Sequence, residues 1–144
     1  MKSFVKRLGC TVFAVALISS LICVSASIYS SQYLDSYRAT LTPKSGGRIV
    51  VSADVAGRGS QEVIGVTKVI IYESTDNKSF YQVETYESDD YPNMLSSGSF
   101  YTKDVLTHYG TPGYYYMASV YCYAGDGTDG TERNYVTASK RAIS

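Results

Sequence analysis

The chain of 144 residues has a single histidine, His108, so catalysis by a histidine base would have to use this side chain. A Ser-His-Asp site could be assembled around it, because histidine can move protons near neutral pH. The sequence lacks, however, the Gly-x-Ser-x-Gly motif that exposes a nucleophilic serine on a sharp turn. We expect His108 to be a surface or capping residue and the protein not to be an enzyme.

Cysteine chemistry is limited for a similar reason. Of three cysteines, Cys10 and Cys23 lie in the apolar N-terminal segment treated below, which leaves Cys122 alone in the rest of the chain. No intramolecular disulfide is then possible, and His108 with Cys122 supplies too few ligands for a metal site. We expect Cys122 to be a small buried hydrophobe and the protein to have no cofactor and no bound metal.

Carboxylates are the remaining chemical resource, and they gather in loops. Asp89 and Asp90 are adjacent, and Asp126 and Asp129 stand in the segment Gly125-Asp126-Gly127-Thr128-Asp129-Gly130. Such loops can hold calcium, but the spacing lacks the ligand order of an EF-hand. Aspartate and glycine are also the residues that tight turns require, and we interpret these aspartates in that way.

Tyrosine is the positive signal, with 15 tyrosines and no tryptophan. Tyr115, Tyr121 and Tyr123 alternate along one predicted strand on the side opposite its small residues. A tyrosine has an apolar ring and a polar tip, which suits a binding surface or a sugar ring. The alternative is structural, since tyrosine is favoured in strands. The three are our candidate ligand-binding residues.

These side chains must be positioned by strands, because no stretch outside the N-terminus has helical periodicity. Runs rich in Tyr, Val, Ile and Thr alternate with short turn segments at close intervals. The predicted strands are Ser36–Thr42, Arg48–Ala56, Val63–Ser74, Ser79–Glu87, Ser99–His108, Tyr114–Ala124 and Asn134–Arg141. Seven short strands at this spacing predict an all-β protein, a two-sheet antiparallel β-sandwich.

Alternation indicates which side chains face the core. The core-facing sets are Ile49, Val51, Ala53 and Val55 in one strand and Tyr116, Ala118, Val120 and Cys122 in another. The stretch 66–72 is apolar on both faces, which is typical of a central strand.

The segment Leu106–Gly113, followed by Tyr116, Ala118 and Val120, resembles the corner and following strand of fibronectin type III domains. Gly125-Asp126-Gly127 resembles a later loop of that family, and Ile70–Ser74 with Phe80 and Val83 resembles one of its hairpins. The resemblance covers about residues 36–141 and implies an immunoglobulin-like sandwich. It also implies that the Tyr116 hydroxyl bonds to the backbone at the corner. One departure is the missing tryptophan of an early strand, whose space Ile49 and Val51 would fill.

The first 26 residues have the three parts of a secretory signal peptide. Lys2, Lys6 and Arg7 precede an apolar run from Leu8 to Val24, and Ala26 offers a cleavage position. We therefore divide the chain into a signal peptide (1–26), a lead-in (27–35) and a β-sandwich domain (36–144). Retention as a membrane anchor and lipidation of Cys23 are the alternatives. The chain also resembles small secreted proteins of Gram-positive bacteria.

Cleavage would leave 118 residues with 10 basic and 13 acidic side chains, a net charge of −3. A mildly acidic domain without a basic cluster argues against nucleic acid as a partner, and no membrane partner is expected after cleavage. We expect a secreted, extracellular binding or adhesion module whose partner is a protein or glycan at the cell surface. The alternatives are a carbohydrate-binding module for cell-wall or host glycans and, less favoured, a small secreted hydrolase.

Overall fold

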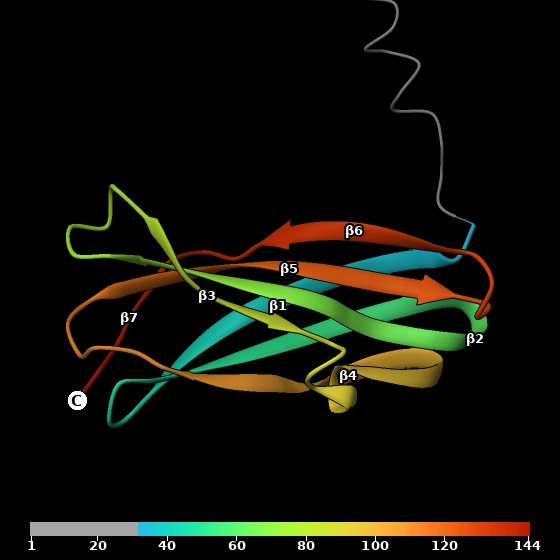
Figure 1. The fold of residues 1–144 in the computed structure, drawn as a ribbon, viewed down its shortest axis with the longest axis horizontal. Helices are drawn as coiled ribbons and strands as arrows, with labels where there is room; N and C mark the ends of the chain where they lie inside the picture. Colours follow the sequence, from blue (N-terminus) through green and yellow to red (C-terminus); the bar gives the residue numbers. More distant parts are fainter. Residues whose placement is uncertain (1–31) are drawn as a thin grey trace, which may run out of the picture. The chain divides into compact units, whose positions relative to one another are not determined.

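The computed structural model describes residues 32–144, and strands dominate this part of the chain (Figure 1). The elements are β1 (Leu34–Lys44), β2 (Arg48–Ser74), β3 (Tyr81–Glu87), the 3-10 turn η1 (Pro92–Met94), β4 (Leu95–Tyr109), β5 (Tyr115–Gly125), β6 (Gly130–Val136) and β7 (Lys140–Arg141). The strands form one seven-stranded sheet in which every pairing is antiparallel. The prediction of an all-β protein is confirmed. The predicted signal peptide lies outside the described residues.

The 27-residue strand β2 organises the sheet, because its two halves have different neighbours. Its first half, residues 48–56, pairs with β1 on one side and β4 on the other. Its second half, residues 63–74, pairs with β3 and β5. β5 pairs in turn with β6 and β7. Within residues 32–144, these three strands therefore join the sheet through the pairing of β5 with the second half of β2.

The two halves of β2 meet in a tight bend at residues 57–62. Figure 1 shows β2 turning back there, and this curls the sheet. Gly59 has a φ of +78°, which favours glycine, and the buried Gln61 amide donates hydrogen bonds to the carbonyls of Arg58 and Gly59. We predicted two strands separated here by a turn. The backbone nevertheless stays in the ladder, because Gly57 pairs with Leu34 and Gln61 pairs with Gly98.

The core contains both sets of alternating side chains that the sequence indicates. Every member of the two sets is buried, as predicted, and they share one cluster with apolar side chains of β1 and β4. The second half of β2 is central, since strands flank it on both sides. The alternation of inward and outward side chains shifts by one residue at Thr67. The register passes directly from Val66–Cys122 to Lys68–Tyr121, so Thr67 has no partner on β5. This bulge lets both Val66 and Val69 face the core.

Some strands begin or end at other residues than predicted, because pairing with a neighbouring strand extends or interrupts them. β1 starts two residues before Ser36, and β4 starts at Leu95 directly after η1. The last predicted strand is two strands, because β6 pairs with β5 up to Ser119–Val136 and β7 pairs again at Tyr115 and Tyr116. Within residues 32–144, no helix is long and apolar enough to cross a membrane.

Cys122 lies fully buried in the core, and burial raises the pKa of its thiol to about 12. The thiolate, which is the reactive form, is therefore scarce at neutral pH, and the sulfur is out of reach of reagents. We expect a maleimide to leave Cys122 unmodified in the folded protein and to modify it fully in denaturant. Peptide mapping by mass spectrometry would separate Cys122 from Cys10 and Cys23. Rapid modification of native Cys122 would contradict the register of β5.

Candidate functional site

The three candidate tyrosines lie on the outer side of β5, but they do not form one cluster. Tyr121 and Tyr123 are neighbours on this side, whereas Tyr115 is six residues away, about 20 Å along the strand. Met117 and the buried Ser119 lie between them. All three tyrosines are half-buried, so no exposed row of tyrosine rings is present on β5.

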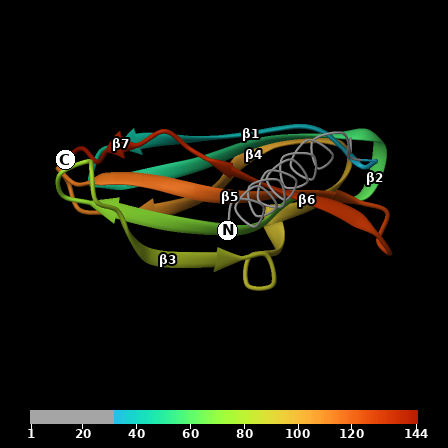
Figure 2. The same ribbon diagram turned by 90° about the horizontal axis from the view of Figure 1, so that it is seen from above.

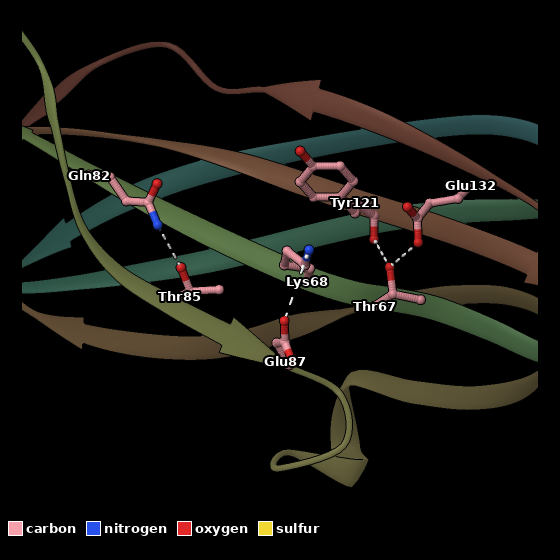
Figure 3. A network of polar contacts seen from close by, with 7 residues as sticks. All are labelled: Thr67, Lys68, Gln82, Thr85, Glu87, Tyr121 and Glu132. Atoms are coloured by element: carbon pink, nitrogen blue, oxygen red, sulfur yellow. Dashed lines mark hydrogen bonds and ion pairs between the residues drawn. The ribbon is translucent and has the colours of Figure 1, made fainter.

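Tyr121 occupies the middle of a row of four side chains on four neighbouring strands. The register places Asn134 of β6 and Lys68 of β2 on either side of Tyr121, and Glu87 of β3 beyond Lys68. The Lys68 ammonium lies 5.4 Å from the centre of the Tyr121 ring and 4.0 Å from a carboxylate oxygen of Glu87 (Figure 3). This cation contacts the ring face and the carboxylate together, and both contacts hold it over the sheet.

The bulge residue Thr67 ties the row to β6. Its hydroxyl lies 2.6 Å from a carboxylate oxygen of Glu132 and 3.3 Å from the backbone carbonyl of Tyr121 (Figure 3). A residue without a ladder partner is free to aim its side chain in this way. The bulge therefore holds the Glu132 carboxylate close to the backbone of Tyr121.

The outer side of β5 and of the second half of β2 forms a mixed surface, here called the tyrosine face. Its members are Lys68, Ile70, Tyr72, Met117, Tyr121 and Tyr123, all of them half-buried. Val136 of β6 is 53% exposed and adds to the apolar part at the position across from Ser119. The Tyr123 ring lies over Gly125 and Gly130, in the space that a side chain at either glycine would need.

Sequence reasoning found Tyr121 but not the residues that surround it. Lys68, Glu87 and Glu132 come from β2, β3 and β6, and only the register of these strands brings them to Tyr121. The alternation of Lys68, Ile70 and Tyr72 on one side of a central strand is the signal in the sequence that could have shown that β2 contributes to the tyrosine face.

The carboxylates of the glycine-rich loop serve the turn, as interpreted from the sequence. One Asp126 oxygen accepts hydrogen bonds from the backbone N–H groups of Thr128 and Asp129, and the other accepts one from the Tyr33 hydroxyl. The N–H groups of Asp129 and Thr128 hold the pKa of Asp126 below its usual range. Asp76 binds the N–H groups of Lys78 and Ser79 in the same manner, and its pKa is also lowered. Within residues 32–144, no cluster of three His, Cys, Asp or Glu side chains could hold a metal ion.

The prediction that His108 is a surface residue is wrong, since it is only 8% exposed. Its Nδ1 lies 3.0 Å from the Tyr86 hydroxyl, and its ring packs against Tyr116 with a centroid distance of 5.5 Å. Burial lowers the pKa of His108, while Glu84 and Glu73 oppose this shift. The ring is buried because β3 brings Tyr86 over it, a contact between residues 22 positions apart.

The buried His108 makes stability depend on pH. Its pKa in the folded state is below the ordinary 6.5, so the unfolded chain binds more protons between the two values. We expect the free energy of unfolding to fall as the pH drops below about 6.5, by at most about 1.4 kcal/mol per pH unit. Urea denaturation between pH 7.5 and 4.5 measures this slope.

The control for this pH dependence is His108→Gln, which cannot titrate. Hydrogen bonds from backbone N–H groups lower the pKa values of Asp76 and Asp126, so the stability that their protonation removes is lost at lower pH than that of His108, and equally in both proteins. The variant should have a flatter profile between pH 6.5 and 4.5. Equal slopes in the two proteins would mean that His108 does not cause the dependence.

No family model, no curated protein and no solved structure matches this chain.

Proposed function

We propose that the protein is an exported, non-enzymatic binding module with an immunoglobulin-like β-sandwich, and that the tyrosine face binds a protein partner. The N-terminal sequence with the pattern of a signal peptide supports export. The observation that carries the binding role is the row through Tyr121, in which a half-buried ring is held beside Lys68 and next to apolar side chains.

The sandwich interpretation rests on the two halves of β2. One sheet would hold β1, the first half of β2 and β4, and the other would hold β3, the second half of β2, β5 and β6. In support, Figure 2 has β1 and β4 toward one side of the domain and β3 toward the other. Inward side chains of both groups also share one core cluster. The Tyr116 hydroxyl accepts a hydrogen bond from the Thr111 backbone at 2.7 Å, as the fibronectin type III resemblance implies.

The composition of the tyrosine face favours a protein over a glycan. Stacking against a sugar needs a ring face open to solvent, but Lys68 lies over the Tyr121 ring, and Met117 and Ser119 interrupt the tyrosines of β5. Tyrosine and methionine are enriched at protein interfaces, and a polar rim commonly surrounds an apolar centre. Ile70, Tyr72 and Met117 supply such a centre, and Glu87 and Glu132 stand at its border.

The test measures binding of the fluorescently labelled protein to three probes: intact Gram-positive cells, the same cells after trypsin shaving, and purified peptidoglycan. We expect saturable binding to intact cells, its loss after shaving, and a drop of about tenfold or more in Tyr121→Ala. Tyr109→Ala is the matched control, because Tyr109 is 76% exposed and lies on β4, away from the tyrosine face.

Three results would contradict the proposal. Equal binding of Tyr121→Ala and the parent would exclude the tyrosine face as the binding surface. Undiminished binding to shaved cells and to peptidoglycan that is lost in Tyr121→Ala would mean that the tyrosine face binds a glycan. The absence of saturable binding to any of the three probes would argue against a cell-surface binding module.

A further inference from the structure

We infer that the protein has a second ligand site, for a short saccharide, on the outer side of β1, β2 and β4. A shallow pocket of 390 Å³ lies there, at the low end of the range for small-molecule sites. It is lined by Ser36, Tyr37 and Arg38 of β1, by residues 54–56 of β2, and by Phe100 and Thr102 of β4. None of these residues belongs to the tyrosine face.

The register arranges this lining in two rows across three strands. Arg38, Asp54 and Thr102 form one row, and Ser36, Ala56 and Phe100 form the next. A guanidinium, a carboxylate and a hydroxyl thus stand beside an aromatic ring. Phe100 is 74% exposed, so its ring is open to a ligand.

The charged groups of the pocket are available to a ligand. Arg38 and Asp54 are both exposed, and within residues 32–144 neither side chain has a hydrogen bond or an ion pair to another residue. Tyr37, in contrast, pairs with the buried Val55, and its ring meets the edge of the Tyr135 ring at 6.3 Å between centroids, so this ring lies on the other side of the sheet. The pocket therefore combines one exposed ring, that of Phe100, with free donors and acceptors.

A saccharide is the ligand class that uses all of these groups. A sugar ring has an apolar face that can cover Phe100, and its hydroxyls can donate to Asp54 and accept from Arg38. A wholly apolar ligand would remove Arg38 and Asp54 from water without pairing them, at a cost of free energy. A phosphate-rich ligand would be repelled by the Asp54 carboxylate. The net charge of −3 on residues 27–144 also disfavours such a ligand.

A glycan array carrying bacterial cell-wall and mammalian saccharides tests the inference, followed by calorimetric titration of the best binder. We expect a saccharide with millimolar or better affinity, and a loss of about tenfold or more in Phe100→Ala. Asp54→Asn should weaken binding by a smaller factor, since the amide still accepts a hydrogen bond. The fold should tolerate both changes, because the two side chains are exposed, and a thermal melt would verify this.

Two control variants separate this site from the rest of the surface. Tyr109→Ala removes an equally exposed ring from β4, outside the pocket, and should leave saccharide binding unchanged. Tyr121→Ala should also leave it unchanged, so failure of the tyrosine face and failure of this pocket are distinguishable. The inference is overturned if no saccharide binds at millimolar concentration or if Phe100→Ala binds as the parent does. It is also overturned if Phe100→Ala converts a dimer to a monomer in size-exclusion chromatography, since a second copy would then occupy the pocket.

Discussion

Gly65→Ala is expected to lower the free energy of unfolding by roughly 3 kcal/mol or more, a large part of the stability of a domain of this size. Gly65 has a φ of +146°, a conformation that side chains rarely adopt. An added Cβ would also meet the backbone carbonyl oxygen of Met94 and would lie 3.0 Å from the Tyr101 ring. This backbone oxygen, at the end of η1, cannot move aside as a flexible side chain can.

The location of Gly65 explains why the substitution should destabilise the whole domain. It pairs with Leu95 of β4 and with Tyr123 of β5, so it joins the two portions of the sheet directly after the bend in β2. Displacement of β2 at this residue would disturb both ladders. The measurement is equilibrium denaturation in urea together with the thermal midpoint, which should fall by about 10 °C or more.

Gly98→Ala is the matched control for Gly65→Ala. Gly98 also has a positive φ, +120°, but a Cβ added there would meet no atom within 4 Å. This variant should lose only the backbone contribution, about 1–2 kcal/mol. The difference between the two variants isolates the close approach to Met94. Equal losses would mean that the backbone conformation alone explains the effect.

The parts of the fold that could be predicted from the sequence depend on local alternation. Ile49, Val51, Ala53 and Val55 face the core because successive side chains of a strand point to opposite sides. The same rule explains Tyr116 and Cys122 in β5. It requires no knowledge of which strands pair, and for this reason it succeeded in both strands.

The parts that could not be predicted depend on contacts between distant segments. The bulge at Thr67 exists only relative to the register of β5, and it changes which residues of β2 face inward. His108 is buried because Tyr86 of β3 covers it. The candidate site has the same origin: Tyr121 could be placed on an outer face, but Lys68 reaches its ring only because β2 pairs with β5, and Glu132 comes near only because β6 does.

Tyr116→Phe is the second substitution with a large expected effect, about 2 kcal/mol off the free energy of unfolding. The Tyr116 hydroxyl accepts a hydrogen bond from the Thr111 N–H and donates one to a Glu73 carboxylate oxygen, each at 2.7 Å. Tyr116 is fully buried, and burial is the main reason that its pKa is raised. Phenylalanine keeps the ring and leaves the half-buried carboxylate without this donor.

The approach of Tyr116 to the corner depends on Gly110, whose missing side chain leaves room for the end of the ring. The hydroxyl therefore connects the turn after β4 with the second half of β2, two segments that lie more than 35 residues apart in the sequence. A double-mutant cycle of Tyr116→Phe with Glu73→Ala, which removes the acceptor oxygen, measures the energy of the contact with Glu73. Tyr109→Phe serves as the control, because that side chain is 76% exposed and should lose almost nothing.

The size of the coupling energy decides what the corner contributes. A coupling energy of about 1.5 kcal/mol or more, the range of a hydrogen bond to a charged group, would show that Tyr116 and Glu73 stabilise the fold as a pair. Additive losses would assign the effect to the Thr111 bond alone, and the corner would then be local to the turn. If Tyr116→Phe unfolds at the same urea concentration as the parent, water replaces both bonds, and the corner does not contribute to stability.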